Sequence, residues 1–146
     1  MVTDFTTTIV VDKKAKEVFD AITNVRGWWQ GEIAGNTNKR GEEFNYRMNH
    51  IHYSRQKIEE LIPNKKVVWL VTDSNLSSFE DKSEWTGTKI IFEIEDLGNK
   101  TQVRFTHVGL TPAFQCYGEC SWAWGQLIRE SLHSLIMTGK GIEVFS

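Results

Sequence analysis

Apolar residues recur at every third or fourth position between Thr111 and Gly141, a spacing that places them on one face of a helix. The face comprises Tyr117, Cys120, Trp124, Ile128, Ser131 and Leu135. Thr111 followed by Pro112 predicts the helix start, because threonine caps a first turn and proline tolerates its first position. Gly139 predicts the end, because glycine adopts the left-handed conformation that closes a helix. A helix with such a stripe must cover a large apolar surface.

Most of the chain before this helix alternates between apolar and polar residues, which is typical of strands with one buried face. The alternation predicts strands at residues 3–11, 42–48, 51–62, 66–72, 85–97 and 101–108, with a weaker one at 31–36. After the first strand, Asp12 predicts the cap of a short helix that buries Ala15, Val18, Phe19 and Ile22. Residues 24–30 predict a second short helix or turn, and the polar residues 73–84 predict a long loop.

The order of these elements predicts an α+β fold in a single domain over residues 1–146. Successive hairpins form an antiparallel meander, and such a sheet needs one covered face. We therefore expect a curved antiparallel β-sheet wrapped around one long C-terminal helix, with two short helices after the first strand. A cavity between a curved sheet and its helix is a frequent place for ligands.

Composition is that of an ordinary globular domain, with 146 residues of which 40% are hydrophobic. The net charge of −2 does not favour binding to nucleic acid or to an anionic membrane surface. No apolar run approaches the ~20 residues that cross a bilayer. Residues 1–14 lack the basic and apolar regions of a signal peptide. We therefore expect a cytoplasmic protein without membrane insertion.

The chain has two cysteines, Cys116 and Cys120, which lie about one helical turn apart in the predicted helix. Two cysteines are far too few for a small domain held together by disulfides. A bridge within a helix would also be strained. We therefore expect both thiols to be free.

Histidines are the residues that could bind a metal or take part in catalysis. His50 and His52 would point to the same side of a strand, but no third ligand has a matching spacing. His107 lies on the inward side of its predicted strand, where it could orient a ligand or act as a general base. We favour the alternative, a core histidine hydrogen-bonded to a backbone carbonyl or to Tyr46. Because catalytic motifs and paired carboxylates are absent, we expect no enzyme activity, metal or cofactor.

The predicted inner surface of the sheet and helix is rich in large apolar side chains. They form a hydrophobic core, and they are also suited to line a pocket for an apolar or aromatic small molecule. The candidate ligand-binding residues are Phe44, Tyr46, Met48, Trp69, Phe92, Phe105, His107, Trp124 and Ile128. Trp122 would project from the other side of the helix, where residues 142–146 cover it or a partner protein contacts it.

Several motifs resemble the START-like superfamily, also called SRPBCC or helix-grip, and within it the branch of activators of heat-shock-protein ATPase. They lie at residues 15–23, Trp28–Trp29, residues 60–69, Thr88, and residues 103–110 and 124–135. The resemblance implies the same fold that the alternation predicts. Members are similar to co-chaperones, lipid carriers and aromatic-ring cyclases, so the resemblance implies lipid or other hydrophobic ligands, or a role in the stress response.

Two functions from different classes are therefore expected. The first is a cytoplasmic module that holds an apolar or aromatic small molecule under the long helix. The second, implied by the resemblance, is a co-chaperone that stimulates a heat-shock chaperone ATPase. In the better-understood co-chaperones a separate N-terminal domain makes much of the chaperone contact, whereas this chain begins at its first predicted strand. We therefore expect weak stimulation or none. A cyclase-like activity ranks third.

Overall fold

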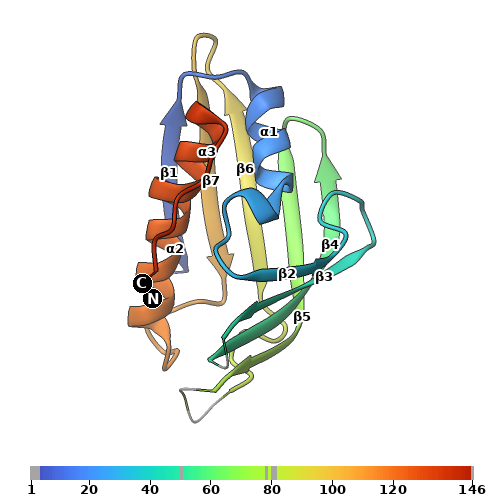
Figure 1. Ribbon diagram of the computed structural model, residues 1–146, viewed down its shortest axis with the longest axis vertical. Helices are drawn as coiled ribbons and strands as arrows, with labels where there is room; N and C mark the ends of the chain where they lie inside the picture. The colour runs from blue at the N-terminus through green and yellow to red at the C-terminus, as the bar shows by residue number, and fades with distance from the viewer. Residues whose placement is uncertain (1–3, 50, 78, 80–81, 146) are drawn as a thin grey trace.

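The computed structural model describes residues 4–49, 51–77, 79 and 82–145. Its main layer is a seven-stranded antiparallel sheet in the order β1-β7-β6-β5-β4-β3-β2 (Figure 1). Strands β2 to β7 form a meander, and β1 joins the far edge by pairing with β7. The strands are β1 (Phe5–Val11), β2 (Glu32–Gly35), β3 (Glu43–Met48), β4 (His52–Ile62), β5 (Lys66–Leu76), β6 (Lys89–Asp96) and β7 (Thr101–Val108).

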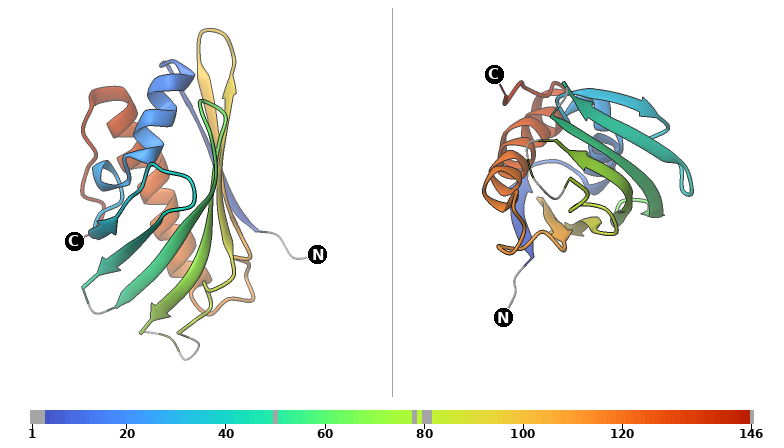
Figure 2. Two further views of the ribbon diagram at one scale, coloured as in Figure 1. Left: turned by 90° about the vertical axis from the view of Figure 1, so that its right-hand side faces the viewer. Right: turned by 90° about the horizontal axis from the view of Figure 1, so that it is seen from below.

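All helices pack on one face of this sheet, and the sheet bends around them (Figure 2). Register shifts between β4 and β5, beside Arg55 and Ile58, are irregularities of the kind that bend strands. After β1 the chain forms α1 (Ala15–Thr23) and then a single 3₁₀ turn, η1 (Val25–Gly27). The expected α+β helix-grip architecture is confirmed, although the second of the two short helices is only this turn.

The C-terminal helix begins at Tyr117, so the predicted start at Thr111 and Pro112 is wrong. It runs through α2 (Tyr117–Gln126), a π-helical segment η2 (Leu127–Leu132) and α3 (His133–Thr138), and ends at Gly139 with a φ of 85°. Residues 111–116 form turns instead. The cause is a cap from outside the local sequence: the Glu84 carboxylate accepts hydrogen bonds from the backbone N–H groups of Gln115 and Cys116.

Two other boundaries differ from the sequence prediction. The N-cap of α1 is Lys14 and not Asp12, and its backbone N–H donates to the Glu17 carboxylate at 3.1 Å. Strand β5 extends to Leu76, into the segment predicted as a loop. This extension carries a buried polar residue, Ser74, whose hydroxyl lies 2.8 Å from that of Thr86. A buried serine satisfied by another hydroxyl breaks the apolar alternation on which the prediction depended.

The core lies between the sheet and the helices. At one end of the sheet α1 buries Val18 and Ile22 and packs against β6 and α3. At the other end α2 faces the sheet without a second helix between them (Figure 1). Within the described part of the chain, no helix has the length and apolar character needed to span a bilayer.

Candidate ligand-binding cavity

A cavity of about 680 Å³ lies between α2 and the ends of β3, β4 and β5. Its volume falls within the range of roughly 300–1,000 Å³ typical of small-molecule sites. The lining comprises Trp29, Tyr46, Met48, Asn49, Ile51, His52, Leu76, Phe79, Trp85, Gly118, Glu119, Cys120, Trp122, Ala123, Trp124, Leu127 and Phe145. Aromatic and aliphatic side chains dominate this set, so the interior of the cavity is apolar.

Stacked aromatic rings form much of the cavity wall. The Trp29 ring stacks on the Tyr46 ring with centroids 4.1 Å apart, and the Trp85 ring stacks on Trp124 at 5.7 Å. The two pairs are in contact through Trp29 and Trp124, whose ring centroids lie 5.0 Å apart. The Tyr46 hydroxyl donates to the backbone carbonyl of Gln30 at 2.6 Å, and burial raises its pKa well above the usual range. The phenol therefore stays protonated and holds the ring in place.

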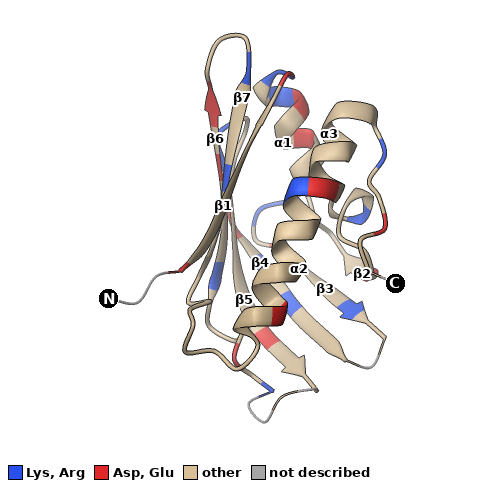
Figure 3. Ribbon diagram, turned by 90° about the vertical axis from the view of Figure 1, so that its left-hand side faces the viewer, with Lys and Arg blue, Asp and Glu red and all other residues tan. Residues whose placement is uncertain are grey.

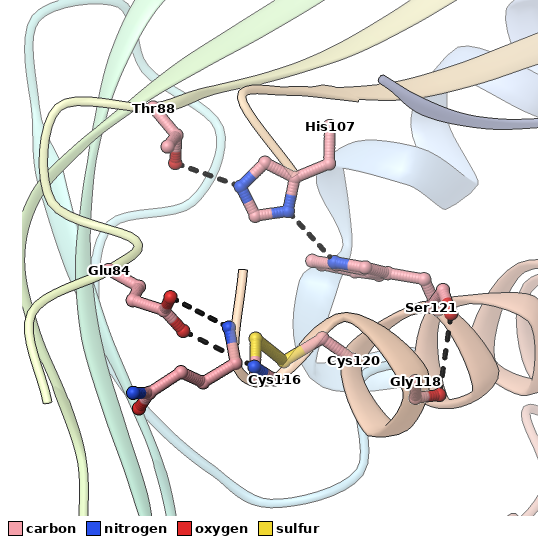
Figure 4. Close-up of a disulfide and its surroundings, with 9 residues drawn as sticks. Glu84, Thr88, His107, Cys116, Gly118, Cys120 and Ser121 are labelled. Carbon is pink, nitrogen blue, oxygen red and sulfur yellow. Dashed lines mark hydrogen bonds between the residues drawn. A yellow bond between two sulfur atoms is a disulfide. The ribbon is translucent and has the colours of Figure 1, made fainter. Parts of the chain in front are cut away.

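His107, which lies outside the cavity lining, positions the second ring pair, Trp85 and Trp124. The Trp124 indole N–H donates to His107 Nδ1 at 3.1 Å, and the other ring nitrogen lies 2.8 Å from Thr88 Oγ1 (Figure 4). Because an indole N–H can only donate, the His107 proton is on Nε2 and points to Thr88. The Thr88 hydroxyl donates in turn to the Trp85 carbonyl at 2.6 Å. This chain of hydrogen bonds positions both tryptophans.

His107 is thus a core histidine, but its expected partners, a backbone carbonyl or Tyr46, are wrong. The residue is fully buried, and that burial, with a smaller effect from His52, lowers its pKa to about 3. The imidazole is therefore neutral at physiological pH. It does not line the cavity, and both its nitrogens are engaged.

His52 is the second neutral imidazole, and it does line the cavity. Its ring meets the rings of Tyr46 and Trp85 edge to face, with centroids 5.2 and 4.6 Å away. Burial lowers the pKa of His52 to about 4. Among the described residues no group of three potential ligands could hold a metal ion. The other histidine of the pair considered from the sequence, His50, lies outside the described residues.

Cys116 and Cys120 form a disulfide, so the expectation of free thiols is wrong (Figure 4). The error follows from the predicted helix start, which placed both cysteines within one helix. Cys116 precedes the first residue of α2, with φ −84° and ψ 2°, and its Cα lies 5.5 Å from that of Cys120. That separation is within the usual range of about 4.4–6.8 Å for disulfides. Cys120 lines the cavity, so the bridge closes one part of its wall.

The mouth of the cavity carries Trp122, which is 56% exposed as the helical spacing predicts. Its ring centroid lies 6.1 Å from that of Phe145 in the C-terminal tail. The Gln30 side chain holds this tail, because its carbonyl accepts from the N–H groups of Val144 and Phe145 and its amide donates to the Phe145 carbonyl. The tail therefore contacts Trp122 but leaves much of its ring exposed.

The nine candidate residues separate into two groups. Tyr46, Met48 and Trp124 line the cavity. The others are buried but do not line it: Phe44, Trp69, Phe92, Phe105, His107 and Ile128.

Sequence reasoning missed several lining residues, of which Trp85 is the most informative. It was assigned to the predicted strand at residues 85–97, whereas it lies in the turns before β6. A tryptophan next to a polar segment and close to Gly87 was the available signal, because so large an apolar ring is seldom left in a solvated loop. Trp29 was noted as part of a motif but was not assigned to the site.

The helix-grip fold and the cavity under its C-terminal helix define a START-like protein. The sequence model of the family described as Activator of Hsp90 ATPase homolog 1-like protein matches residues 12–136. The chain therefore belongs to this family. A comparison with curated proteins finds no match.

Solved structures agree on the fold. The Aha1 dimer from Colwellia psychrerythraea is 27% identical, with a TM-score of 0.77 over 95% of this chain and 99% of that one. Protein MLL2253 from Mesorhizobium loti is 15% identical, with a TM-score of 0.70 over 94% and 99%. DynU16, from the dynemicin biosynthetic locus, is 12% identical, with a TM-score of 0.66 over 93% and 48%.

Proposed function

We propose that this protein binds an apolar or aromatic small molecule in the cavity between α2 and the sheet. The observation that carries the proposal is the cavity of about 680 Å³ whose wall is built from the ring pairs Trp29–Tyr46 and Trp85–Trp124. These four rings are at most 3% exposed, so they form an apolar base for the cavity, while Trp122, which is 56% exposed, offers a ligand more accessible ring surface. The hydrogen bonds of Tyr46 and Trp124 hold these rings before any ligand arrives. Such preorganisation lowers the entropy lost on binding.

The expected affinity follows from the area that a ligand would bury. Burying about 200 Å² of apolar ligand surface contributes roughly 5 kcal/mol at 25 cal/mol per Å². Stacking adds to this, and the loss of translational and rotational freedom offsets a large part. Affinities in the micromolar range are therefore expected for a bicyclic aromatic compound.

Calorimetric titration with naphthylmethanol tests the proposal, because this compound is flat, apolar and uncharged. Ala123 lines the cavity, so Ala123→Phe fills it and should weaken binding by more than about tenfold, the equivalent of 1.4 kcal/mol. Gly125→Ala is the matched control on the same helix, because a Cβ there meets nothing within 4 Å and the residue is outside the lining. Equal affinity in all three proteins, or no binding to the unmodified protein, would contradict the proposal.

The proposed activity is binding without catalysis. A general base must reach the proton that it removes, and His107 is engaged with Trp124 and Thr88 behind the cavity wall. Mass spectrometry of a bound aromatic compound after prolonged incubation should recover it unchanged. Conversion of the compound, abolished by His107→Gln, would instead support the cyclase-like alternative.

A second candidate, binding to a heat-shock chaperone, is favoured by the exposed Trp122 on α2 and by the family to which the chain belongs. Exposed tryptophans are frequent at protein interfaces. A coupled ATPase assay with the chaperone should show weak stimulation or none if small-molecule binding is the function. Strong stimulation that Trp122→Ala abolishes would favour a co-chaperone acting in the stress response.

The cytoplasm stays our proposed location, and the Cys116–Cys120 disulfide provides its test. Disulfides are rare in cytosolic proteins because cellular thiols keep cysteines reduced. Alkylation in intact source cells before lysis should therefore label both cysteines if the location is correct. Unlabelled cysteines would indicate an oxidising compartment.

A further inference from the structure

Glu119 is the charged residue of the cavity lining, which contains neither lysine nor arginine among the residues that the structure describes. It is exposed, and it lies in the first turn of α2. In Figure 3 an acidic band lies near the start of α2, and helix α2 itself carries no basic band. An exposed amide, Asn49, also belongs to the lining. The cavity thus combines an apolar interior with polar groups of neutral or negative charge.

The buried polar atoms near the cavity do not add a positive charge. His52 is neutral at physiological pH, because burial lowers its pKa to about 4. Its Nε2 atom and the Trp85 Nε1 atom have no hydrogen-bond partner among the described residues, and neither is exposed on the cavity wall. The Tyr46 hydroxyl is already bonded to Gln30. A carboxylate inside the cavity would therefore lose its hydration without gaining a cationic partner.

Two cations lie on neighbouring segments, but neither lines the cavity. Arg47 follows Tyr46 in β3 and so points to the opposite face of the sheet, where its guanidinium lies 4.9 Å from the centre of the Tyr53 ring. Lys82 Nζ donates to the carbonyl of Phe79 at 3.0 Å, which holds its ammonium group at the loop backbone. Among the residues that the structure describes, Glu119 therefore supplies the charge of the cavity lining.

We propose, on the basis of the binding function above, that the cavity selects flat aromatic compounds that are neutral or positively charged and rejects carboxylate amphiphiles such as fatty acids. Tryptophan faces attract cations through the negative charge of their π-systems. Trp122, which is 56% exposed at the mouth of the cavity, offers such a ring, and the Glu119 carboxylate adds attraction there. Binding of an anion is disfavoured, because burying its charge without a cationic partner costs free energy.

Calorimetric titration with three matched probes at neutral pH tests this selectivity. Naphthylmethanol is neutral, naphthylmethylamine is a cation and naphthoate is an anion, while their ring systems are the same. We expect naphthoate to bind at least about tenfold more weakly than the alcohol, because its charge would be buried unpaired. We expect the amine to bind about two- to fivefold more tightly than the alcohol through the Trp122 ring and Glu119.

Variants on one helix separate the contribution of Glu119 from that of the rings. Glu119→Gln should reduce the ratio of amine to alcohol affinity, whereas Glu130→Gln, an exposed residue outside the lining, should leave the ratio unchanged. A ratio that does not respond to Glu119→Gln would contradict the role of this carboxylate. Tightest binding of naphthoate, or equal binding of all three probes, would overturn the selectivity while leaving the binding function intact. Failure of all three to bind would contradict the binding function itself.

Discussion

The interface between the sheet and the C-terminal helix has two ends with similar side chains and different packing. At the end covered by α1, Trp69 and Phe92 are completely buried and contact Trp28, whose indole N–H donates to the Ile22 carbonyl of α1. The Trp69 ring lies 5.0 Å from that of Phe92 and 6.4 Å from that of Trp28, so rings fill the space. At the end near the start of α2, rings of the same kinds surround a cavity of about 680 Å³.

The difference arises from a third element, and not from residue type. Helix α1 inserts Val18 and Ile22 at the filled end, both with no exposed surface. At the open end the chain before Tyr117 forms turns, and Trp85 and Trp124 stack on each other. Aromatic residues thus form a filled core where a third layer covers them and a cavity wall where none does. A composition rich in tryptophan indicates either outcome equally.

The largest expected effect comes from deleting a ring at the filled end. Trp69→Ala should lower the free energy of unfolding by about 3–5 kcal/mol, because it leaves a void that neighbouring rings cannot fill. Met48→Ala, at the half-buried cavity lining, should cost less than about 1.5 kcal/mol, because the side chain already borders open space. Urea-induced unfolding measures both values. Equal losses would show that the two ends do not differ in packing.

Acid should destabilise the open end, where His52 lines the cavity and His107 lies behind its wall, both as neutral rings. Their folded-state pKa values of about 3 and about 4 lie below the unfolded value of about 6.5. The unfolded chain therefore binds protons first, so stability is full above pH ~6.5 and falls as the pH drops towards the folded-state values. We expect a loss of about 2 kcal/mol for each histidine between pH 7 and pH 5.

Urea melts across this pH range measure the effect of the histidines. His107→Gln is the informative variant, because it should reduce the slope of stability against pH whatever its own cost in stability. An unchanged slope would mean that His107 is charged or exposed in the folded protein, in disagreement with its hydrogen bonds to Trp124 and Thr88.

The disulfide should make a smaller contribution at the open end. Loop closure over a separation of four residues predicts a loss of about 2 kcal/mol when Cys116 and Cys120 are both replaced by serine. Because Cys120 lines the cavity, affinity for naphthylmethanol should fall together with stability. Thiol titration of the purified protein, unfolded without reductant, should find no free thiol. Two free thiols would restore the expectation from the sequence.

The smallest effect is expected at the mouth of the cavity. Trp122→Ala should cost less than about 1 kcal/mol, because more than half of this side chain is exposed. Trp124→Ala, two residues further along, removes a ring with 1% exposure and the partner of His107. Chemical denaturation of the two variants should therefore differ clearly, and similar losses would mean that the helical phase around Trp122 is incorrect.

The alternation of apolar and polar residues predicted the fold well wherever buried and exposed positions alternate along a strand. Strand β7 has the predicted boundaries, because Val103, Phe105 and His107 all face inward and their neighbours do not. Prediction failed where distant groups decide the structure. The start of α2 depends on Glu84, which lies more than thirty residues earlier, and the disulfide depends on that start. The position of the cavity depends on where α1 stops covering the sheet, which spacing does not show.

The most direct test of small-molecule binding at the open end is an NMR measurement of nuclear Overhauser contacts between naphthylmethanol and methyl groups of the protein. We expect contacts to the methyl groups of Met48, Ala123 and Leu127, which line the cavity. No contacts are expected to Val18 or Ile22, which fill the other end. Contacts confined to exposed surface residues such as Val10 or Ile62, or the absence of any contact, would contradict the account.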